Sequence, residues 1–151
     1  MKKVLSLVLA LMMVFCFTAV MTGCGGGSDE GGSDGAYKVG FIMLHDENST
    51  YDKNFIDAAN KACDNLGVEA VIKTNIPEGQ ECYDAAAELA DAGCGIVFAD
   101  SFGHEPYMIQ AAQEFPDVQF CHATGTRAHT EGLDNYHNAF ASIYEGRYLA
   151  G

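Results

Sequence analysis

The fold is decided by residues 37–72, which read YKVGFIMLHDENSTYDKNFIDAANKACDNLGVEAVI. Residues 37–44 form a mostly apolar run of the kind that a buried strand shows. The next sixteen-residue segment, 51–66, carries apolar side chains at helical spacing, at Phe55, Ile56, Ala59, Ala62, Cys63 and Leu66. Gly67 predicts the end of this helix, and residues 68–72 form a second strand. A strand, a helix and a strand at this pitch predict a right-handed crossover between parallel strands.

The same alternation continues along the rest of the chain. Helices are expected at residues 81–92, ended by Gly93, and at 107–115, ended by Pro116. The other expected elements are strands at 95–99, 118–122 and 133–136, a loop at 123–132, and a helix at 138–151 with an apolar side of Phe140, Ile143, Tyr144 and Leu149. This pattern predicts an α/β fold, a Rossmann-like parallel sheet with helices on both faces.

The start of the chain has the pattern of an export signal. Two lysines precede an apolar run at residues 4–20, and Gly23-Cys24 follows the run closely. The junction resembles the lipobox of bacterial lipoproteins, which implies a signal peptide at residues 1–23 and a lipid on Cys24. The alternative is an uncleaved anchor, because the run almost reaches the roughly 20 residues that span a bilayer. Both interpretations predict a domain held at the extracytoplasmic face of the cell membrane.

Residues 24–36 are almost wholly Gly, Ser and acidic side chains, a composition that predicts a flexible tether ahead of a folded domain at 37–151. The formal net charge of −13 makes nucleic acid an unsuitable partner. The cysteines of the domain are far apart and lack the spacing of a metal site. They are expected to be buried free thiols, with one or two disulfides as the alternative; they are Cys63, Cys82, Cys94 and Cys121. No metal is expected.

Two polar loops follow strands in this pattern. The first follows residues 37–44 and supplies His45, Asp46, Tyr51, Asp52, Asn54 and Phe55. The second follows residues 95–99 and supplies Asp100, Ser101 and Phe102. Ligands of open parallel sheets bind beyond the carboxyl ends of the strands, where the strand order reverses. Aromatic rings among carboxylates and amides suit a flat polar ligand, so these nine residues are the predicted binding site.

Three residues lie on one side of the first turn of the expected helix, namely Tyr51, Asp52 and Phe55. We expect Asp52 to be exposed there. Two simpler interpretations remain open. Asp52 could be an N-terminal acid favoured by the helix dipole, and Phe55 could be part of the core.

Longer segments give the chain a family resemblance, namely Lys38-Val39-Gly40-Phe41-Ile42, Tyr51-Asp52-Lys53-Asn54-Phe55, Phe115-Pro116-Asp117-Val118-Gln119-Phe120 and Glu145-Gly146-Arg147-Tyr148-Leu149-Ala150-Gly151. In these the chain resembles the basic membrane protein family of substrate-binding lipoproteins that serve ABC importers, some of which are purine-nucleoside receptors. The resemblance implies a type I periplasmic-binding-protein-like fold with two lobes. Residues 37–151 would be the N-terminal lobe, with the second lobe missing.

The resemblance also implies roles for individual residues and partners. Asp52 would bind hydroxyl or base-edge groups of a nucleoside, and Phe55 would stack on its ring. Permease and ATPase subunits would be the protein partners, and no cofactor is implied.

Two other functions stay open. A receptor that hands its solute to a sensor protein would use the same fold and site. An exported α/β-hydrolase is the alternative from another class, because residues 99–103 imitate a nucleophile elbow with Ser101 at its centre. Later histidines could then complete a triad.

Overall fold

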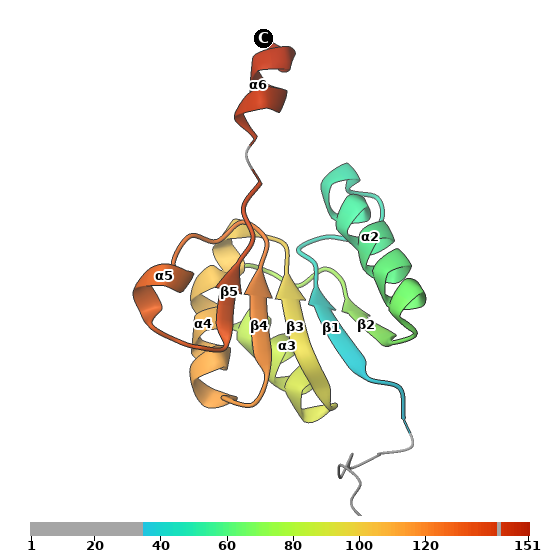
Figure 1. Cartoon of the computed structure of the whole chain (residues 1–151), viewed down its shortest axis with the longest axis vertical. Coiled ribbons are helices and arrows are strands. Elements are labelled where there is room, and N and C mark those ends of the chain that lie inside the picture. The colour runs from blue at the N-terminus through green and yellow to red at the C-terminus, as the bar shows by residue number, and fades with distance from the viewer. Residues whose placement is uncertain (1–34, 142) are drawn as a thin grey trace, which may run out of the picture. The chain divides into compact units, whose positions relative to one another are not determined.

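The computed structural model describes residues 35–141 and 143–151. The expected signal peptide, Cys24 and most of the tether lie outside the described residues. Within them a five-stranded parallel sheet has the order β2-β1-β3-β4-β5 (Figure 1). Its strands are β1 Lys38–Ile42, β2 Glu69–Lys73, β3 Cys94–Ala99, β4 Gln119–His122 and β5 Tyr136–Asn138.

The helices alternate with these strands. They are α2 Thr50–Leu66, α3 Gln80–Asp91, the short 3-10 helix η1 Phe102–His104, α4 Glu105–Glu114, α5 Ala128–Glu131 and α6 Tyr144–Ala150. Ser49 caps the start of α2, because its hydroxyl oxygen accepts the backbone N–H of Asp52. Gly67 ends α2 in the left-handed conformation, with φ +67°, which glycine adopts without strain. Both ends of α2 are therefore encoded locally.

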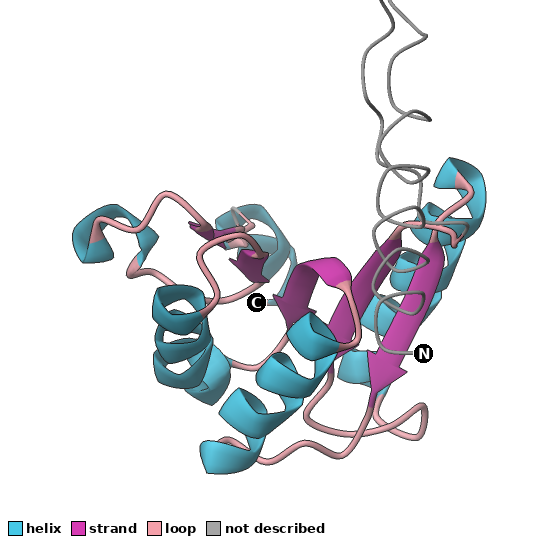
Figure 2. Ribbon diagram, turned by 90° about the horizontal axis from the view of Figure 1, so that it is seen from below, coloured by secondary structure: helices cyan, strands magenta, loops and turns pink. Residues whose placement is uncertain are grey.

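Helices cover both faces of the sheet (Figure 2). On one face, α3 and α4 pack on the sheet and bury a core that includes Leu89, Val97, Met108 and Phe120. On the other face, α2 packs over β1 and buries a smaller cluster centred on Phe41 and Ile56. The expected α/β architecture with helices on both faces is confirmed.

The layer of helices on the α2 face of the sheet is thinner than the prediction implies. No second helix joins α2 on its face of the sheet within the described residues. Phe98, near the carboxyl end of β3, therefore keeps 38% of its surface exposed. Its ring stacks on Phe41 at a centroid distance of 5.4 Å.

The structure corrects the prediction after residue 122. The expected loop at 123–132 contains the short helix α5, and the fifth strand spans Tyr136–Asn138 instead of 133–136. Asn135 explains the shift, because its side-chain amide donates to the carbonyls of Ala112, Phe115 and Val118 and so anchors the chain just before the strand. The sheet ladder then begins at Tyr136.

The last expected helix, 138–151, is also shorter. Asn138 pairs with His122 in the sheet, and its side chain accepts the N–H of Ala128, so it cannot begin a helix. The helical segment is Tyr144–Ala150, so Phe140 and Ile143 of the expected apolar side precede the helix. All four residues of that side are exposed.

Candidate functional site

The strand order reverses between β1 and β3, and the two polar loops meet there. From β1 the chain crosses to β2 on one side, whereas from β3 it crosses to β4 on the other. The backbone N–H of Leu44, just past β1, donates to Asp100 Oδ1 across 3.1 Å. The Tyr51 hydroxyl donates to the Asp100 carbonyl across 3.0 Å. The structure thus brings together the two predicted loops at the position where open α/β sheets bind ligands.

Asp52 is fully buried, which corrects the expectation that it is exposed. Its Oδ1 accepts the backbone N–H of His45 at 2.8 Å, and its Oδ2 accepts the Ser49 hydroxyl at 2.5 Å. The His45 ring nitrogen Nδ1 also lies 3.1 Å from Oδ2. Burial acts to raise the pKa of Asp52, but the bonds from Ser49 and His45 outweigh it and lower the pKa to about 2. Asp52 therefore holds the loop after β1 in place as a carboxylate.

Asp100 is buried as well, with 2% of its surface exposed. Its Oδ2 has no hydrogen-bond partner among the described residues. Burial raises the pKa of Asp100 to about 7, and the nearby Asp52 carboxylate raises it further. Two neighbouring acids thus differ strongly in their affinity for a proton.

The remaining polar residues of the first loop are closer to solvent. The His45 side chain is 60% exposed above Asp52. Asp46 accepts the N–H of Asn48 at 2.9 Å and so shapes the turn that leads into α2. Asn54 is exposed, and its amide donates back to the Thr50 carbonyl of its own helix. Among the described residues, Asn54 makes no hydrogen bond to the loop after β3.

Three aromatic rings of the predicted site differ in exposure. Phe102 is 66% exposed and Tyr51 is 48% exposed, both at the carboxyl edge of the sheet. Phe55 is half-buried against the cluster under α2, and its ring lies 5.0 Å from that of Tyr51. Phe55 is thus partly a core residue, as the simpler interpretation held, while Phe102 presents a free face.

Ser101 does not have the surroundings of a catalytic nucleophile. Its hydroxyl donates to the carboxylate of Glu78, which also accepts the N–H of Gly103 at 2.8 Å. The nearby imidazoles are used elsewhere. His104 Nε2 donates to the Ile76 carbonyl at 2.9 Å, and His122 Nε2 donates to the Ser101 carbonyl at 2.6 Å. No described histidine forms a hydrogen bond with the Ser101 hydroxyl, so a serine–histidine pair is not formed.

Glu78, His104 and His122 were missed by the sequence prediction. Each is distant in sequence from the residue that it contacts, by 23, 28 and 21 positions. One signal was available, because Glu78 follows β2 and His122 ends β4, and both therefore belong to the carboxyl edge of the parallel sheet. These three residues connect neighbouring loops of the site.

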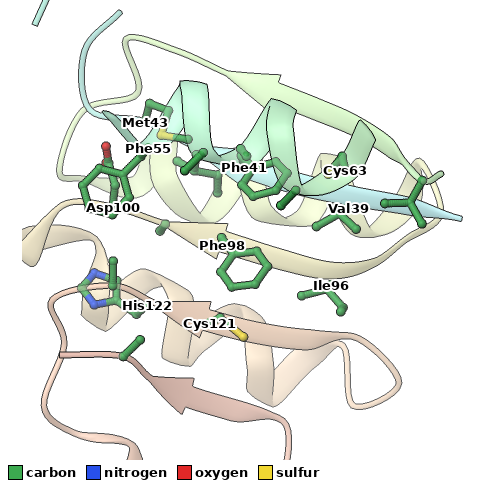
Figure 3. A pocket seen from close by; sticks show the side chains of 18 of the residues that line it. Val39, Phe41, Met43, Phe55, Cys63, Ile96, Phe98, Asp100, Cys121 and His122 are labelled. Carbon is green, nitrogen blue, oxygen red and sulfur yellow. The ribbon is translucent and has the colours of Figure 1, made fainter. Parts of the chain in front are cut away.

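An apolar groove of about 450 Å³ lies between α2 and the uncovered part of the sheet. Figure 3 shows Phe55 and Cys63 of α2 along one side with Phe41 of β1, and Phe98 and Ile96 of β3 along the other. Asp100 and His122 lie at one end of the groove (Figure 3). The groove is a hydrophobic surface that reaches the polar site only at this end.

The described residues offer neither a metal site nor a membrane-spanning helix. Within 35–141 and 143–151, no group of three or more His, Cys, Asp or Glu side chains is placed to hold a metal ion. The four described cysteines are free thiols. No helix in this part of the chain is both long and apolar enough to cross a bilayer.

The fold and site define the class of the protein, an α/β ligand-binding domain with its site where the strand order reverses. Residues 40–151 match the family described as ABC transporter substrate-binding protein PnrA-like, and the chain belongs to this family. The family resemblance found in the sequence is thereby confirmed. Proteins of this family are substrate-binding components of ABC transporters.

Two curated relatives carry names that indicate different solutes. A purine-binding protein of Brucella abortus (strain 2308) is 35% identical over 119 residues, which are 76% of this chain and 32% of that protein. A Haloferax volcanii protein assigned as an ABC transporter glucose-binding protein is 38% identical over 64 residues, 42% of this chain and 15% of that protein. The chain spans no more than about a third of the length of these relatives.

Solved structures with the same fold include a solute-binding protein of an ABC transporter system from Conexibacter woesei DSM 14684. Its TM-score is 0.61 at 18% identity, covering 70% of this chain and 35% of that chain. A fragment assigned as a lipoprotein from Peptoclostridium difficile 630 has a TM-score of 0.57 at 16% identity, covering 76% of this chain and 93% of that one. The expected type I periplasmic-binding-protein-like fold is confirmed, and the chain forms part of that domain.

Proposed function

We propose that the chain is the solute-capturing component of an ABC importer and that its solute is a purine nucleoside. The observation that carries this proposal is the group at the reversal of strand order, where exposed rings lie beside buried carboxylates. Tyr51 and Phe102 present ring faces to solvent, and His45 presents an imidazole beside them at the carboxyl edge. A purine can stack on such rings while its polar edge and sugar meet hydrogen-bonding groups.

The roles of the carboxylates follow from their burial. Because both oxygens of Asp52 already accept hydrogen bonds, its first role is to position His45 and the loop after β1. Asp100 has an oxygen without a partner and borders the apolar groove, so it is the acid that can accept a donor from the solute. We propose Asp100, His45, Tyr51 and Phe102 as the ligand contacts, with the Phe55 ring packed beside that of Tyr51.

The choice of a purine rests on the family and on the Brucella relative, whose name states purine binding. The Haloferax relative, assigned to glucose, makes a sugar the second candidate. A sugar lacks a flat aromatic face, and two exposed rings favour the purine over it. The proposal further includes a lipid on Cys24, which would hold the domain at the outer face of the membrane beside the permease.

The structure gives no support to the hydrolase. Ser101 donates its hydroxyl to Glu78, and the neighbouring histidines donate to backbone carbonyls. A nucleophile needs a base within hydrogen-bond reach that is itself oriented by a third group. We therefore propose a binding function without turnover. A receptor that serves a sensor protein would use the same contacts, and co-purification of permease and ATPase subunits distinguishes transport from sensing.

Calorimetry on the full-length gene product tests the solute. Adenosine, guanosine and inosine are titrated in parallel with glucose and ribose. The expected result is binding of at least one nucleoside and no binding of glucose. Binding of glucose alone would replace the nucleoside with a sugar, and binding of neither class would contradict the assignment of the site.

A further inference from the structure

Two buried carboxyl groups meet at the reversal of strand order. Asp52 comes from the first turn of α2 and Asp100 from the end of β3, and at most 2% of either residue is exposed. The backbone N–H groups of two consecutive residues, Leu44 and His45, donate to Asp100 Oδ1 at 3.1 Å and to Asp52 Oδ1 at 2.8 Å. The two carboxyl groups lie close enough that each shifts the pKa of the other. Ionised carboxylates are acceptors only, so two buried carboxyl groups this close can bond to each other only if one of them carries a proton.

The donors around the pair are unevenly divided. Asp52 receives the backbone N–H of His45 and the hydroxyl of Ser49, at 2.8 and 2.5 Å. Asp100 receives only the backbone N–H of Leu44, at Oδ1, and its Oδ2 is buried without a donor. Asp52 is thus stabilised as a carboxylate. Protonation is therefore more favourable at Asp100 Oδ2 than at either oxygen of Asp52.

We propose that Asp52 and Asp100 share a single proton, carried on Asp100 Oδ2 and donated to the Asp52 carboxylate. The direction of both pKa shifts agrees with this arrangement. Burial and the neighbouring Asp52 raise the pKa of Asp100 to about 7, while donors outweigh burial at Asp52 and lower its pKa to about 2. The protein therefore binds or releases this proton near neutral pH.

The other ionisable groups around the pair do not supply a positive charge in place of the shared proton. Burial and the charge of Asp100 raise the pKa of the Cys82 thiol to about 12, and burial lowers the pKa of His104, so both are neutral at pH 7. None of the described groups that act on Asp100 is a lysine or an arginine. The groups facing the pair are Tyr51 from α2, His45 from the loop after β1, Cys82 from α3 and His104 from η1.

A consequence for binding rests on the proposed function. For Asp100 to accept an N–H or O–H from a solute, the shared proton must leave. Solute uptake then releases about one proton below pH 7. Affinity should rise about tenfold between pH 6 and pH 8 and level off above that range.

Thermal unfolding of the full chain tests the shared proton without any solute. Because the folded-state pKa of Asp100 lies above its unfolded value of about 3.9, its contribution to stability is present at low pH and is lost as pH rises toward 7. In Asp100→Asn the amide donates to Asp52 in place of the proton. The variant should melt close to the parent at pH 5 and above the parent at pH 8.

The matched control is Asp64→Asn, an exposed acid on the same helix as Asp52. Its melting difference from the parent should stay the same at both pH values. An equal difference for Asp100→Asn at pH 5 and pH 8 would overturn the shared proton. Carboxyl ¹³C NMR on aspartate-labelled parent gives a second measurement, in which one resonance should titrate near pH 7. Titration of all aspartates below pH 5 would also overturn it.

Calorimetry with inosine at pH 6.5 tests the coupling. The observed heat should differ between phosphate and Tris buffers in proportion to their ionisation enthalpies, and this difference should vanish in Asp100→Asn. Inosine binding with buffer-independent heat would overturn the coupling. Failure of inosine to bind counts against the proposed function, and the melting and NMR measurements then decide the shared proton by themselves.

Discussion

The phenolic oxygen of Tyr51 donates a hydrogen bond to the backbone carbonyl of Asp100, 3.0 Å away. Tyr51 belongs to the first turn of α2, whereas Asp100 follows β3, so the bond joins segments that lie 49 residues apart in the chain. About half of the Tyr51 residue remains exposed. The bond therefore fixes an exposed ring beside the buried carboxyl pair.

Replacing Tyr51 with Phe removes this bond and keeps the ring. The free energy of unfolding should fall by about 0.5–1.5 kcal/mol, because one partly buried hydrogen bond is lost. Urea unfolding followed by circular dichroism measures it, since the chain has no tryptophan. Tyr148→Phe is the control, because Tyr148 is 87% exposed and should tolerate the change. Equal stability of Tyr51→Phe and the parent would show that the bond does not hold α2.

Phe102 and Phe55 should respond in opposite ways to truncation. Phe102 is largely exposed, so Phe102→Ala should weaken nucleoside binding about tenfold or more, by the 1–3 kcal/mol that stacking contributes, and leave stability nearly unchanged. Phe55 packs on the cluster under α2, so Phe55→Ala should cost on the order of 2 kcal/mol of stability. Calorimetry and urea unfolding separate the two effects. A loss of stability without a loss of binding in Phe102→Ala would remove Phe102 from the site.

Ser101 should be chemically inert. The full chain should show no ester hydrolysis and no covalent labelling by a fluorophosphonate probe, because the Ser101 hydroxyl faces a carboxylate without an imidazole. Ser101→Ala should lower the free energy of unfolding by about 1 kcal/mol through loss of the bond to Glu78. Stoichiometric labelling of the parent that disappears in Ser101→Ala would restore the hydrolase.

Cys24 should carry the lipid. Cys24→Ala should abolish labelling by a radioactive fatty acid and leave a precursor with its signal uncleaved, because the thiol is the acceptor in the predicted lipobox. Labelling in membranes of an expressing bacterium measures this. Cys63→Ala provides a control on a buried thiol and should be labelled like the parent. Persistent labelling of Cys24→Ala would contradict the lipoprotein assignment.

Gly40 should tolerate no side chain. A Cβ at this position would lie 2.9 Å from Cδ1 and 3.2 Å from Cβ of Leu89, which packs on β1 from α3. Gly40→Ala should therefore destabilise the protein by about 1–3 kcal/mol through overpacking. Gly35→Ala has no atom within 4 Å of the new Cβ and should unfold like the parent. Equal midpoints for both variants would show that α3 can shift to make room.

Some parts of the structure were determined by the sequence itself. Helical spacing at Phe55, Ile56 and Ala59, with Gly67 after it, placed α2 within one residue at its start, because spacing and caps act over a few residues. The alternation of strand and helix likewise implied a parallel sheet, and parallel strands bring their carboxyl ends to one edge. That rule correctly predicted that the loops carrying His45 and Asp100 meet.

Only the tertiary structure decided which atoms of the site remain free. The sequence suggested an exposed Asp52, yet folding brings His45 and Ser49 over it and buries Asp100 against it. Glu78 became the partner of Ser101 because the sheet order places the loops after β2 and β3 at the same edge. Contacts between segments far apart in the chain depend on sheet order and packing, and local spacing carries no record of either.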